Sequence, residues 1–177
     1  CIKMEKIIKY IKENLPNSFI IAGNVSSVDG VRDLDTWGAD SIKVGIGPGK
    51  SCTTWPATGF GSRNCQASTI WNCSMFTNKP IIADGGIRVP GDIAKSLVLG
   101  ANMVMVGGML SCFQDSPGNV VIQNGVTYKE FWGSASQFQS GKKNRIEGTK
   151  ILKVIKNKTL LEELESIGEA IQSGISY

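Results

Sequence analysis

The chain has 177 residues, 41% of them apolar and 19% charged, which fits one globular unit and excludes a disordered polypeptide. Its formal net charge of +4 suits small anionic ligands but is too low for a protein whose main partner is nucleic acid. No apolar run reaches the roughly 20 residues of a membrane helix, and the N-terminal stretch is not a signal peptide. We therefore expect a cytoplasmic protein that binds neither nucleic acid nor membranes.

The residue types present limit the chemistry. The sequence contains no histidine, which excludes histidine triads and histidine-based metal sites. Its five cysteines are an odd number without CxxC spacing, so neither a disulfide framework nor a zinc site is indicated, and a reducing compartment is expected. Acid–base chemistry must then come from carboxylates, hydroxyls or thiols.

Apolar periodicity predicts helices that alternate with short buried strands. The boundaries are marked by Pro16, by Ser26 or Ser27 as an N-cap, and by Gly38 as a helix end. In chain order we predict a helix over about 2–15, a strand over 19–22, a helix over about 28–37, a strand over 41–46, a helix over about 66–76, a strand over 80–83, a helix over about 91–99 and a strand over 102–106. Such strands are typical of parallel βαβ units, so we expect an α/β fold.

The number of units indicates part of a barrel. A complete (β/α)8 TIM barrel takes about 250 residues, whereas four βα units are visible here. We expect residues 1–177 to form one domain that supplies about the last four βα units of such a barrel. The chain starts with Cys1, within a predicted helix, which favours a piece of a longer polypeptide.

The regular alternation ends after the fourth strand. Asn124-Gly125, between the apolar runs 120–122 and 126–132, is a type I′ hairpin signal. The polar stretch 134–149 is predicted to be a mobile loop, so that a hairpin and a flap-like loop occupy about 119–158. A last helix, from about 160 to 172, is predicted to have one apolar face, made by Leu160, Leu161, Leu164, Ile167 and Ile171.

Three glycine-rich segments follow three successive strands, on the face where barrel enzymes build their active sites. The first, Gly45–Thr54, places Cys52 on an exposed loop, although a tight turn with a bystander cysteine is an equal reading. The other two contain Gly85-Gly86 and Gly107-Gly108, whose bare amides suit a phosphate group. Asp84 is placed to accept hydrogen bonds from ribose hydroxyls, or else caps a turn. Cys65, Cys73 and Cys112 are expected to be buried or half-buried fillers.

These segments resemble the IMP dehydrogenase and GMP reductase family. The string Gly45–Thr54 is similar to the family's cysteine loop, and the two glycine pairs fall where the family holds ribose and phosphate. Gly47-Pro48-Gly49 and the segment 133–136, followed by Glu147-Gly148, are similar to the reductase branch in particular. Trp55 is a departure, because that branch usually has arginine or lysine there.

The resemblance implies an activity: NADPH-dependent reductive deamination of GMP to IMP and ammonia, through a purine bound covalently to Cys52. Thr54 and Glu147 would move the proton that ammonia requires. The implied substrate contacts are Ser51, Asp84, Gly85, Gly86, Gly107, Gly108, Gly133, Ser134 and Ala135. The implied cofactor contacts are Ile46, Gly47 and Ser134. The resemblance also implies a potassium site at Gly47, Gly49 and Cys52, and a homotetramer.

Other functions remain open from the sequence. IMP dehydrogenase shares the thiol chemistry but oxidises IMP to XMP with NAD. A truncated remnant of the family would keep the fold without the activity. A flavin-dependent barrel enzyme would use the same phosphate cradle, but it leaves the cysteine loop unexplained.

Overall fold

The structure, a computed structural model, describes residues 2–133, 136–141 and 148–177. Its helices are α1 (Ile2–Asn14), α2 (Val28–Thr36), α3 (Thr54–Thr58), α4 (Gln66–Ser74), α5 (Pro90–Val98), α6 (Gln137–Ser140) and α7 (Leu160–Ile175), with a 3-10 turn at Arg63–Cys65. Its strands are β1 (Ile21–Val25), β2 (Ser41–Val44), β3 (Ile81–Asp84), β4 (Met103–Met105), β5 (Val120–Gln123), β6 (Val126–Trp132) and β7 (Lys150–Val154). None of the described helices is both long and apolar enough to cross a membrane.

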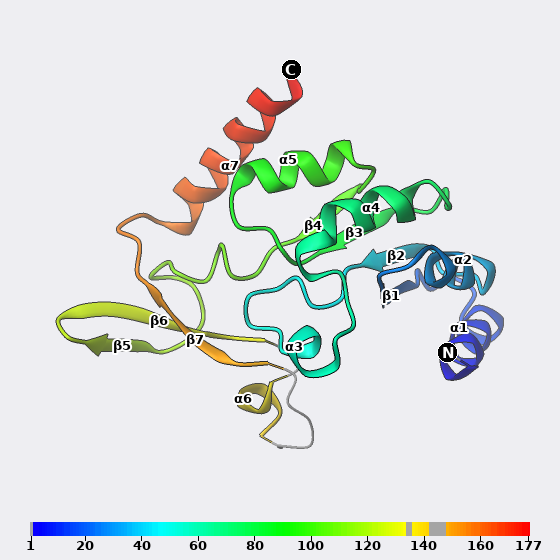
Figure 1. Cartoon of the computed structure of the whole chain (residues 1–177), viewed down its shortest axis with the longest axis horizontal. Helices are drawn as coiled ribbons and strands as arrows, with labels where there is room; N and C mark the ends of the chain where they lie inside the picture. Colours follow the sequence, from blue (N-terminus) through cyan, green and yellow to red (C-terminus); the bar gives the residue numbers. More distant parts are fainter. Residues whose placement is uncertain (1, 134–135, 142–147) are drawn as a thin grey trace.

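The first four strands form one parallel sheet in the order β1-β2-β3-β4, which confirms the predicted α/β fold (Figure 1). The first strand differs from the prediction, because it starts at Ile21 rather than Phe19 and continues through Gly23 to Val25. The pairing with β2 sets this register, since it begins at Ile21↔Ser41. Gly23 cannot carry a side chain there, because a Cβ would lie 2.6 Å from the carbonyl oxygen of Lys43.

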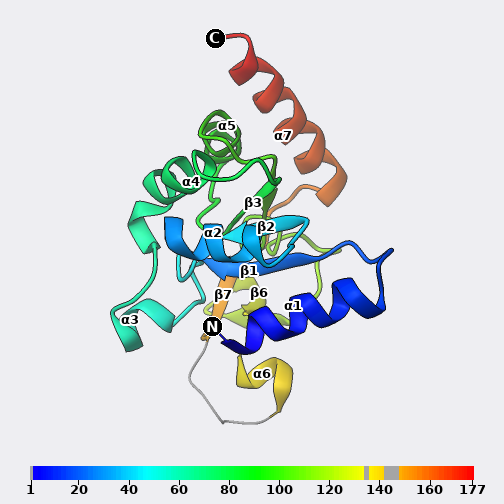
Figure 2. The same ribbon diagram turned by 90° about the vertical axis from the view of Figure 1, so that its right-hand side faces the viewer.

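Helices α2, α4 and α5 cover one face of the parallel sheet, and α7 packs beside α5 (Figure 2). Ser27 caps α2 as predicted, accepting a hydrogen bond from the Gly30 amide at 3.2 Å. Alternate strand residues are buried against the helices. This core contains Ala22, Ile42, Val44, Ile81 and Ala83 from the strands and Val31, Leu34, Ile70 and Cys73 from the helices.

The opposite face of the sheet is only partly covered. Lys43, Ile82 and Asp84 alternate with the buried strand residues and are half-buried. Met103 and Met105, on the edge strand β4, are 52% and 50% exposed. This face therefore carries Lys43 and Asp84 beside apolar side chains that are only partly covered.

A second, antiparallel sheet is formed by β5, β6 and β7. Asn124 and Gly125 have φ values of +51° and +76°, as the predicted type I′ turn between β5 and β6 requires. The third strand, β7, was not predicted and lies within the stretch expected to be a hairpin and loop. It pairs with β6 from Tyr128↔Val154 to Trp132↔Lys150.

Helix α7 has a narrower buried stripe than the sequence indicates. A capping box fixes its start, since Thr159 and Glu162 exchange hydrogen bonds. Ile167 packs with Ile93 of α5, whereas Leu161 and Leu164 on the predicted apolar face are 65% and 46% exposed. Contact with one neighbouring helix leaves the flanks of the apolar face uncovered.

Candidate active site

The loops after β2 and β3 meet at the carboxyl ends of the strands. Gly85 has a φ of +86°, and a Cβ at this position would lie 3.0 Å from Cγ of Pro48 and 3.2 Å from the Gly49 amide nitrogen. This close approach requires glycine and presses the cysteine loop against the Asp84-Gly85-Gly86 turn. The fold thus brings together two of the glycine segments that the sequence separates by more than 30 residues.

Cys52 and Thr54 lie side by side on the cysteine loop. The Sγ atom of Cys52 is 3.3 Å from Oγ1 of Thr54, and the Cys52 amide donates a 3.1 Å hydrogen bond to the carbonyl oxygen of Gly49. The thiol is half-buried and lines a cavity of about 430 Å³, together with Ile46, Gly47 and Thr54. A thiol in this position is accessible to a ligand in the cavity.

A second cavity, of about 560 Å³, adjoins the first. Its lining includes Gly86, Gly107 and Gly108, whereas Cys52 and Thr54 line only the smaller cavity. Asp84 and Gly85 line both cavities. One elongated ligand could therefore contact the thiol at one end and the glycine turns at the other, with Asp84 in the middle.

A hydrogen-bonded cluster holds the carboxylate of Asp84. Its Oδ2 atom accepts from Nζ of Lys43 at 2.6 Å and from Nδ2 of Asn24 at 2.7 Å. Asn24 also donates to the carbonyl oxygen of Gly45 at 2.6 Å. Within the described residues Oδ1 accepts no hydrogen bond, so it is available to a ligand hydroxyl.

Sequence reasoning missed Asn24 and Lys43, although a lysine within an apolar strand was a detectable signal. It also missed Gln66, a buried residue at the start of α4. The Gln66 amide donates to the carbonyl oxygens of Val44 at 3.0 Å and Asp84 at 3.4 Å, and Ser62 donates to its Oε1 at 2.7 Å. Gln66 thus links the ends of β2 and β3 beneath the cysteine loop.

The second sheet lies against the third glycine-rich segment, which contains Gly107 and Gly108. A Cβ at Gly107 or Gly108 would lie 3.5 or 3.7 Å from the ring of Phe131 on β6. Ser51 lies close to both Gly133, just after β6, and Gly148, just before β7. A Cβ at Gly133 would lie 3.4 Å from the Oγ atom of Ser51, and a Cβ at Gly148 would lie 3.4 Å from its carbonyl oxygen. The predicted site residues Ser134, Ala135 and Glu147 lie outside the described residues.

The other cysteines differ from one another in exposure. Cys73 and Cys112 are buried as expected, and burial raises the pKa of the Cys73 thiol. Cys65 is exposed, so the prediction of a filler is wrong there, because the 3-10 turn carries it on the surface. The ring of Trp55 faces the guanidinium group of Arg63, whose Cζ is 3.9 Å from the ring centroid, and Trp55 lines neither cavity.

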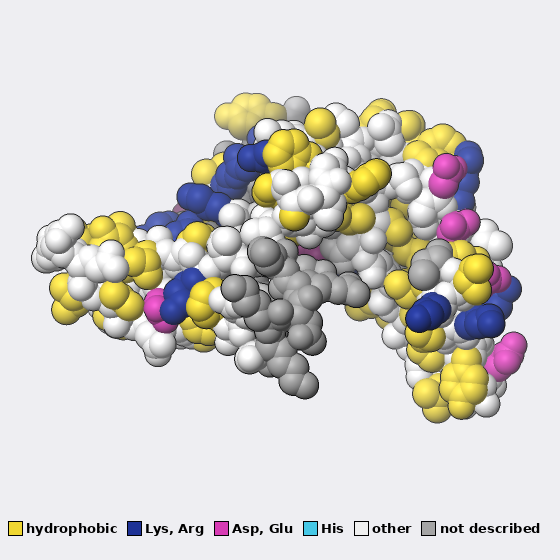
Figure 3. All heavy atoms as spheres, turned by 60° about the horizontal axis from the view of Figure 1, so that its bottom comes forward, with side chains coloured by type: hydrophobic (Ala, Val, Ile, Leu, Met, Phe, Trp, Pro, Cys, Tyr) yellow, Lys and Arg dark blue, Asp and Glu magenta, His cyan; other side chains and the backbone are white. Residues whose placement is uncertain are grey.

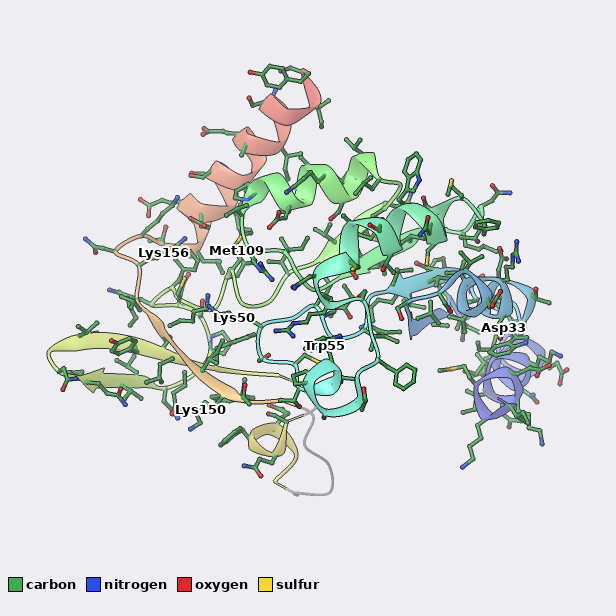
Figure 4. All side chains as sticks on the ribbon, in the orientation of Figure 1. Asp33, Lys50, Trp55, Met109, Lys150 and Lys156 are labelled. Carbon is green, nitrogen blue, oxygen red and sulfur yellow. The ribbon has the colours of Figure 1, made fainter. Side chains whose placement is uncertain are left out.

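Figure 4 labels Lys50 and Met109, which line the larger cavity. Lys50 and Met109 lie on the side of the molecule that faces the β5–β7 sheet, whereas Asp33 lies on distant α2. The arrangement is that of an α/β enzyme in which a thiol and a glycine-rich turn share the carboxyl edge of a parallel sheet. Residues 2–175 match the family model described as IMP dehydrogenase / GMP reductase domain, and the chain belongs to this family.

Individual relatives agree with the family match. The chain is 49% identical to the GMP reductase of Lactobacillus acidophilus over 172 residues, covering 97% of this chain and 52% of the relative. It is 49% identical to the GMP reductase of Delftia acidovorans, covering 98% of this chain and 53% of the relative. The chain thus spans about half the length of the curated relatives it matches.

A solved structure has the same arrangement of elements. The crystal structure of GMP reductase C318A from Trypanosoma brucei, in complex with guanosine 5′-monophosphate, superimposes with a TM-score of 0.87 at 30% identity. The match covers 98% of this chain and 38% of that chain.

Proposed function

We propose that this protein catalyses the NADPH-dependent reductive deamination of GMP to IMP and ammonia. The observation that carries the proposal is that Asp84 lines both the cavity of Cys52 and the cavity of the glycine turns. A nucleoside monophosphate has the same order of groups: a base, a ribose and a phosphate. The relatives named GMP reductase favour GMP over IMP as the substrate.

Each part of GMP would meet a suitable group. The phosphate would rest on the bare amides at Gly85-Gly86 and Gly107-Gly108, because no Cβ blocks the approach of an oxyanion. The ribose hydroxyls would donate to Oδ1 of Asp84. The base would then extend towards Cys52, with Ser51 and the segment 133–135 beside it.

Cys52 would act as the nucleophile. Its thiolate attacks C2 of the purine and forms a C–S bond, and the amino group leaves as ammonia after receiving a proton through Thr54 and Glu147. Thr54 is suited to the relay because its hydroxyl lies 3.3 Å from the sulfur. Hydride addition at C2 then breaks the C–S bond and returns the thiolate.

NADPH, when bound, supplies that hydride. The main chain at Ile46 and Gly47 fits this role because it lines the same cavity as the thiol, and Ser134 is the third proposed contact. Potassium is proposed at the carbonyl groups of Gly47, Gly49 and Cys52. Neutral main-chain carbonyl oxygens are ligands of the kind that replace the hydration shell of a monovalent cation.

We also propose that the parallel sheet is part of a (β/α)8 barrel. Both of its edges, β1 and β4, are unpaired among the described strands, and Ile21, Met103 and Met105 are about half exposed there. Barrel closure would remove such edges. Residues 1–177 would then form one catalytic domain in a cytoplasmic homotetramer, with a hairpin and a flap-like loop within about 119–158.

The test is an assay of the purified protein for GMP-dependent NADPH oxidation with release of ammonia. We expect turnover in the wild type and none above background in Cys52→Ala, with Cys65→Ala, an exposed cysteine elsewhere, as the matched control. Unchanged turnover in Cys52→Ala would sink the mechanism. Formation of XMP from IMP would identify a dehydrogenase, and absence of GMP binding would favour a remnant of the family.

A further inference from the structure

A cation from the second sheet lines the cavity of the glycine turns. Lys153, on β7, lines the larger cavity together with Gly86, Gly107 and Gly108. The residue is half-buried, and its ammonium group has no hydrogen-bond or ion-pair partner within the part of the chain that the structure describes. A lysine that lines a cavity and has no partner can donate hydrogen bonds to an anion that binds there.

The register of the second sheet explains why Lys153 faces this cavity. Lys153 pairs with Lys129, and Ile151 pairs with Phe131, so these four side chains share one face of the sheet. Phe131 marks the direction of that face, because its ring lies against Gly107 and Gly108. Lys153 is therefore held opposite the proposed phosphate cradle.

Lys129, which lies opposite Lys153 across the strand pair, adds a second positive charge that favours the binding of an anion. Like charges directly opposite each other in an antiparallel pair repel. Lys129 is 5% exposed, and its Nζ donates to the carbonyl oxygens of Ser116 at 2.7 Å and Gly118 at 3.3 Å. Lys129 is thus fixed to the main chain, and Lys153 is the member of this pair that can contact a ligand.

The remaining charges around the cavity have the same sign. Among the lining residues, Lys43 is engaged by Asp84, whereas Lys50, Arg88 and Lys153 have no carboxylate partner among the described residues. Figure 3 shows a band of Lys and Arg side chains beside the β5–β6 hairpin. A dianionic group would offset this excess of positive charge.

We propose that Lys153 binds the phosphate group of the nucleotide, with Nζ donating to a phosphate oxygen from the side opposite the glycine amides. The inference rests on the proposed function, since it assigns a further binding residue to the same site. It gives β7 a direct part in substrate recognition. A nucleoside without phosphate would gain nothing from this residue.

The first test is calorimetric binding of GMP and of guanosine to the purified protein and to Lys153→Met. We expect GMP affinity to fall about tenfold, the size of one partly screened charge-assisted hydrogen bond, with guanosine affinity unchanged. Lys150→Met is the matched control, because Lys150 lies on the same strand and is ion-paired with Glu130 at 2.7 Å, away from the cavity lining. It removes the same charge and should change GMP affinity less than twofold.

The second test separates binding from a purely structural role. An ammonium group beside a phosphate stabilises the dianion, so ³¹P NMR of bound GMP should show a second phosphate pKa below its usual value of about 6. In Lys153→Met this pKa should rise towards that value, and Lys153→Arg should restore both the pKa and the affinity. If the Met variant melts at lower temperature than the wild type, Lys153→Gln replaces it.

The outcomes distinguish the two proposals. Equal GMP affinity in the wild type and Lys153→Met would overturn this inference and leave the proposed function standing. Equal losses for GMP and guanosine would also overturn it, because they would indicate a structural role. Absence of GMP binding by the wild type would overturn both.

Discussion

The ammonium group of Lys43 lies 2.6 Å from a carboxylate oxygen of Asp84, across two neighbouring strands of the parallel sheet. Asn24 binds the same oxygen from the strand on the other side of β2. Three adjacent strands thus fix the orientation of one carboxylate at the junction of the two cavities. Such a rigid acceptor is suited to recognise a sugar hydroxyl with little loss of side-chain entropy.

We predict that Asp84→Ala weakens GMP binding about tenfold or more, because the ribose hydroxyls lose their acceptor. The same substitution should leave the affinity for 2′,3′-dideoxy-GMP nearly unchanged, since that ligand lacks the hydroxyls. Calorimetric titration of both ligands measures the difference. Asp33→Ala, on the distant surface of α2, is the control. Equal losses for the two ligands would contradict the assigned contact.

Alkylation by iodoacetamide should distinguish the described cysteines. Cys52 and Cys65 are reachable, whereas Cys73 and Cys112 are buried and should react slowest; burial also raises the pKa of the Cys73 thiol and so reduces its thiolate fraction. At a GMP concentration ten times the dissociation constant, labelling of Cys52 should slow about tenfold by mass action. Labelling of Cys65, followed by mass spectrometry in the same sample, serves as the internal control. Protection of both cysteines would point to a global effect rather than to a ligand over Cys52.

Gly85→Ala should destabilise the fold as well as the site. The positive φ costs an alanine about 1–2 kcal/mol, and the new Cβ would press on Pro48 and Gly49. We expect the melting temperature to fall by roughly 4–8 °C for a loss of about 2 kcal/mol in a chain of this size. Gly91→Ala is the matched control, because Gly91 lies in α5 with open space around its Cβ position, and its melting temperature should be equal or higher. Similar melting temperatures for both variants would show that the two loops are not tightly packed.

The stability contributed by the ion pairs of Glu163, on α7, should depend on pH. Hydrogen bonds from Lys158 and Lys156, each 3.0 Å long, hold the pKa of the buried Glu163 below its ordinary value of 4.5. A lowered folded-state pKa stabilises the protein above the ordinary value, and this stabilisation is lost as the pH falls through the folded-state pKa. Glu163→Gln should therefore reduce the free energy of unfolding by about 1 kcal/mol near neutral pH, allowing for the partly exposed lysines.

Urea unfolding of Glu163→Gln and the wild type, at neutral pH and at several values below 4.5, measures this effect. The difference between the two should shrink towards the acid end. Glu165→Gln, on the exposed face of the same helix, should match the wild type throughout. A difference that grows on acidification would have the wrong sign for this ion pair.

Local signals were sufficient to predict much of the fold and the positions of several candidate site residues. Continuous apolar runs and helix caps indicated the parallel strands, and glycine pairs at strand ends indicated the turns that line the larger cavity. Lys150–Val154 was missed because this short segment neither alternates strictly nor contains a turn signal, and it becomes a strand only through pairing with β6.

The carboxylate cluster depends on long-range register instead. Asp84 is 41 residues from Lys43 and 60 from Asn24, and neither separation has a signature in a single sequence. The same holds for Lys153, whose direction follows from its pairing with Lys129. Contacts of this kind are fixed by which residues face each other across a sheet, and a shift of one residue would turn each side chain to the other face.

Ser51 is a meeting point for both ends of the stretch from Gly133 to Gly148, and its carbonyl oxygen also accepts the Thr149 amide at 2.8 Å. Because both ends of such a segment lie at one buried residue, its length can change while the positions of its ends stay the same. The cost is small, since each doubling of a loop costs only about 0.6 kcal/mol of closure entropy. Insertions or deletions between these glycines during evolution would leave the neighbouring thiol in place. Members of the family that differ there should differ in turnover or ligand preference while folding equally well.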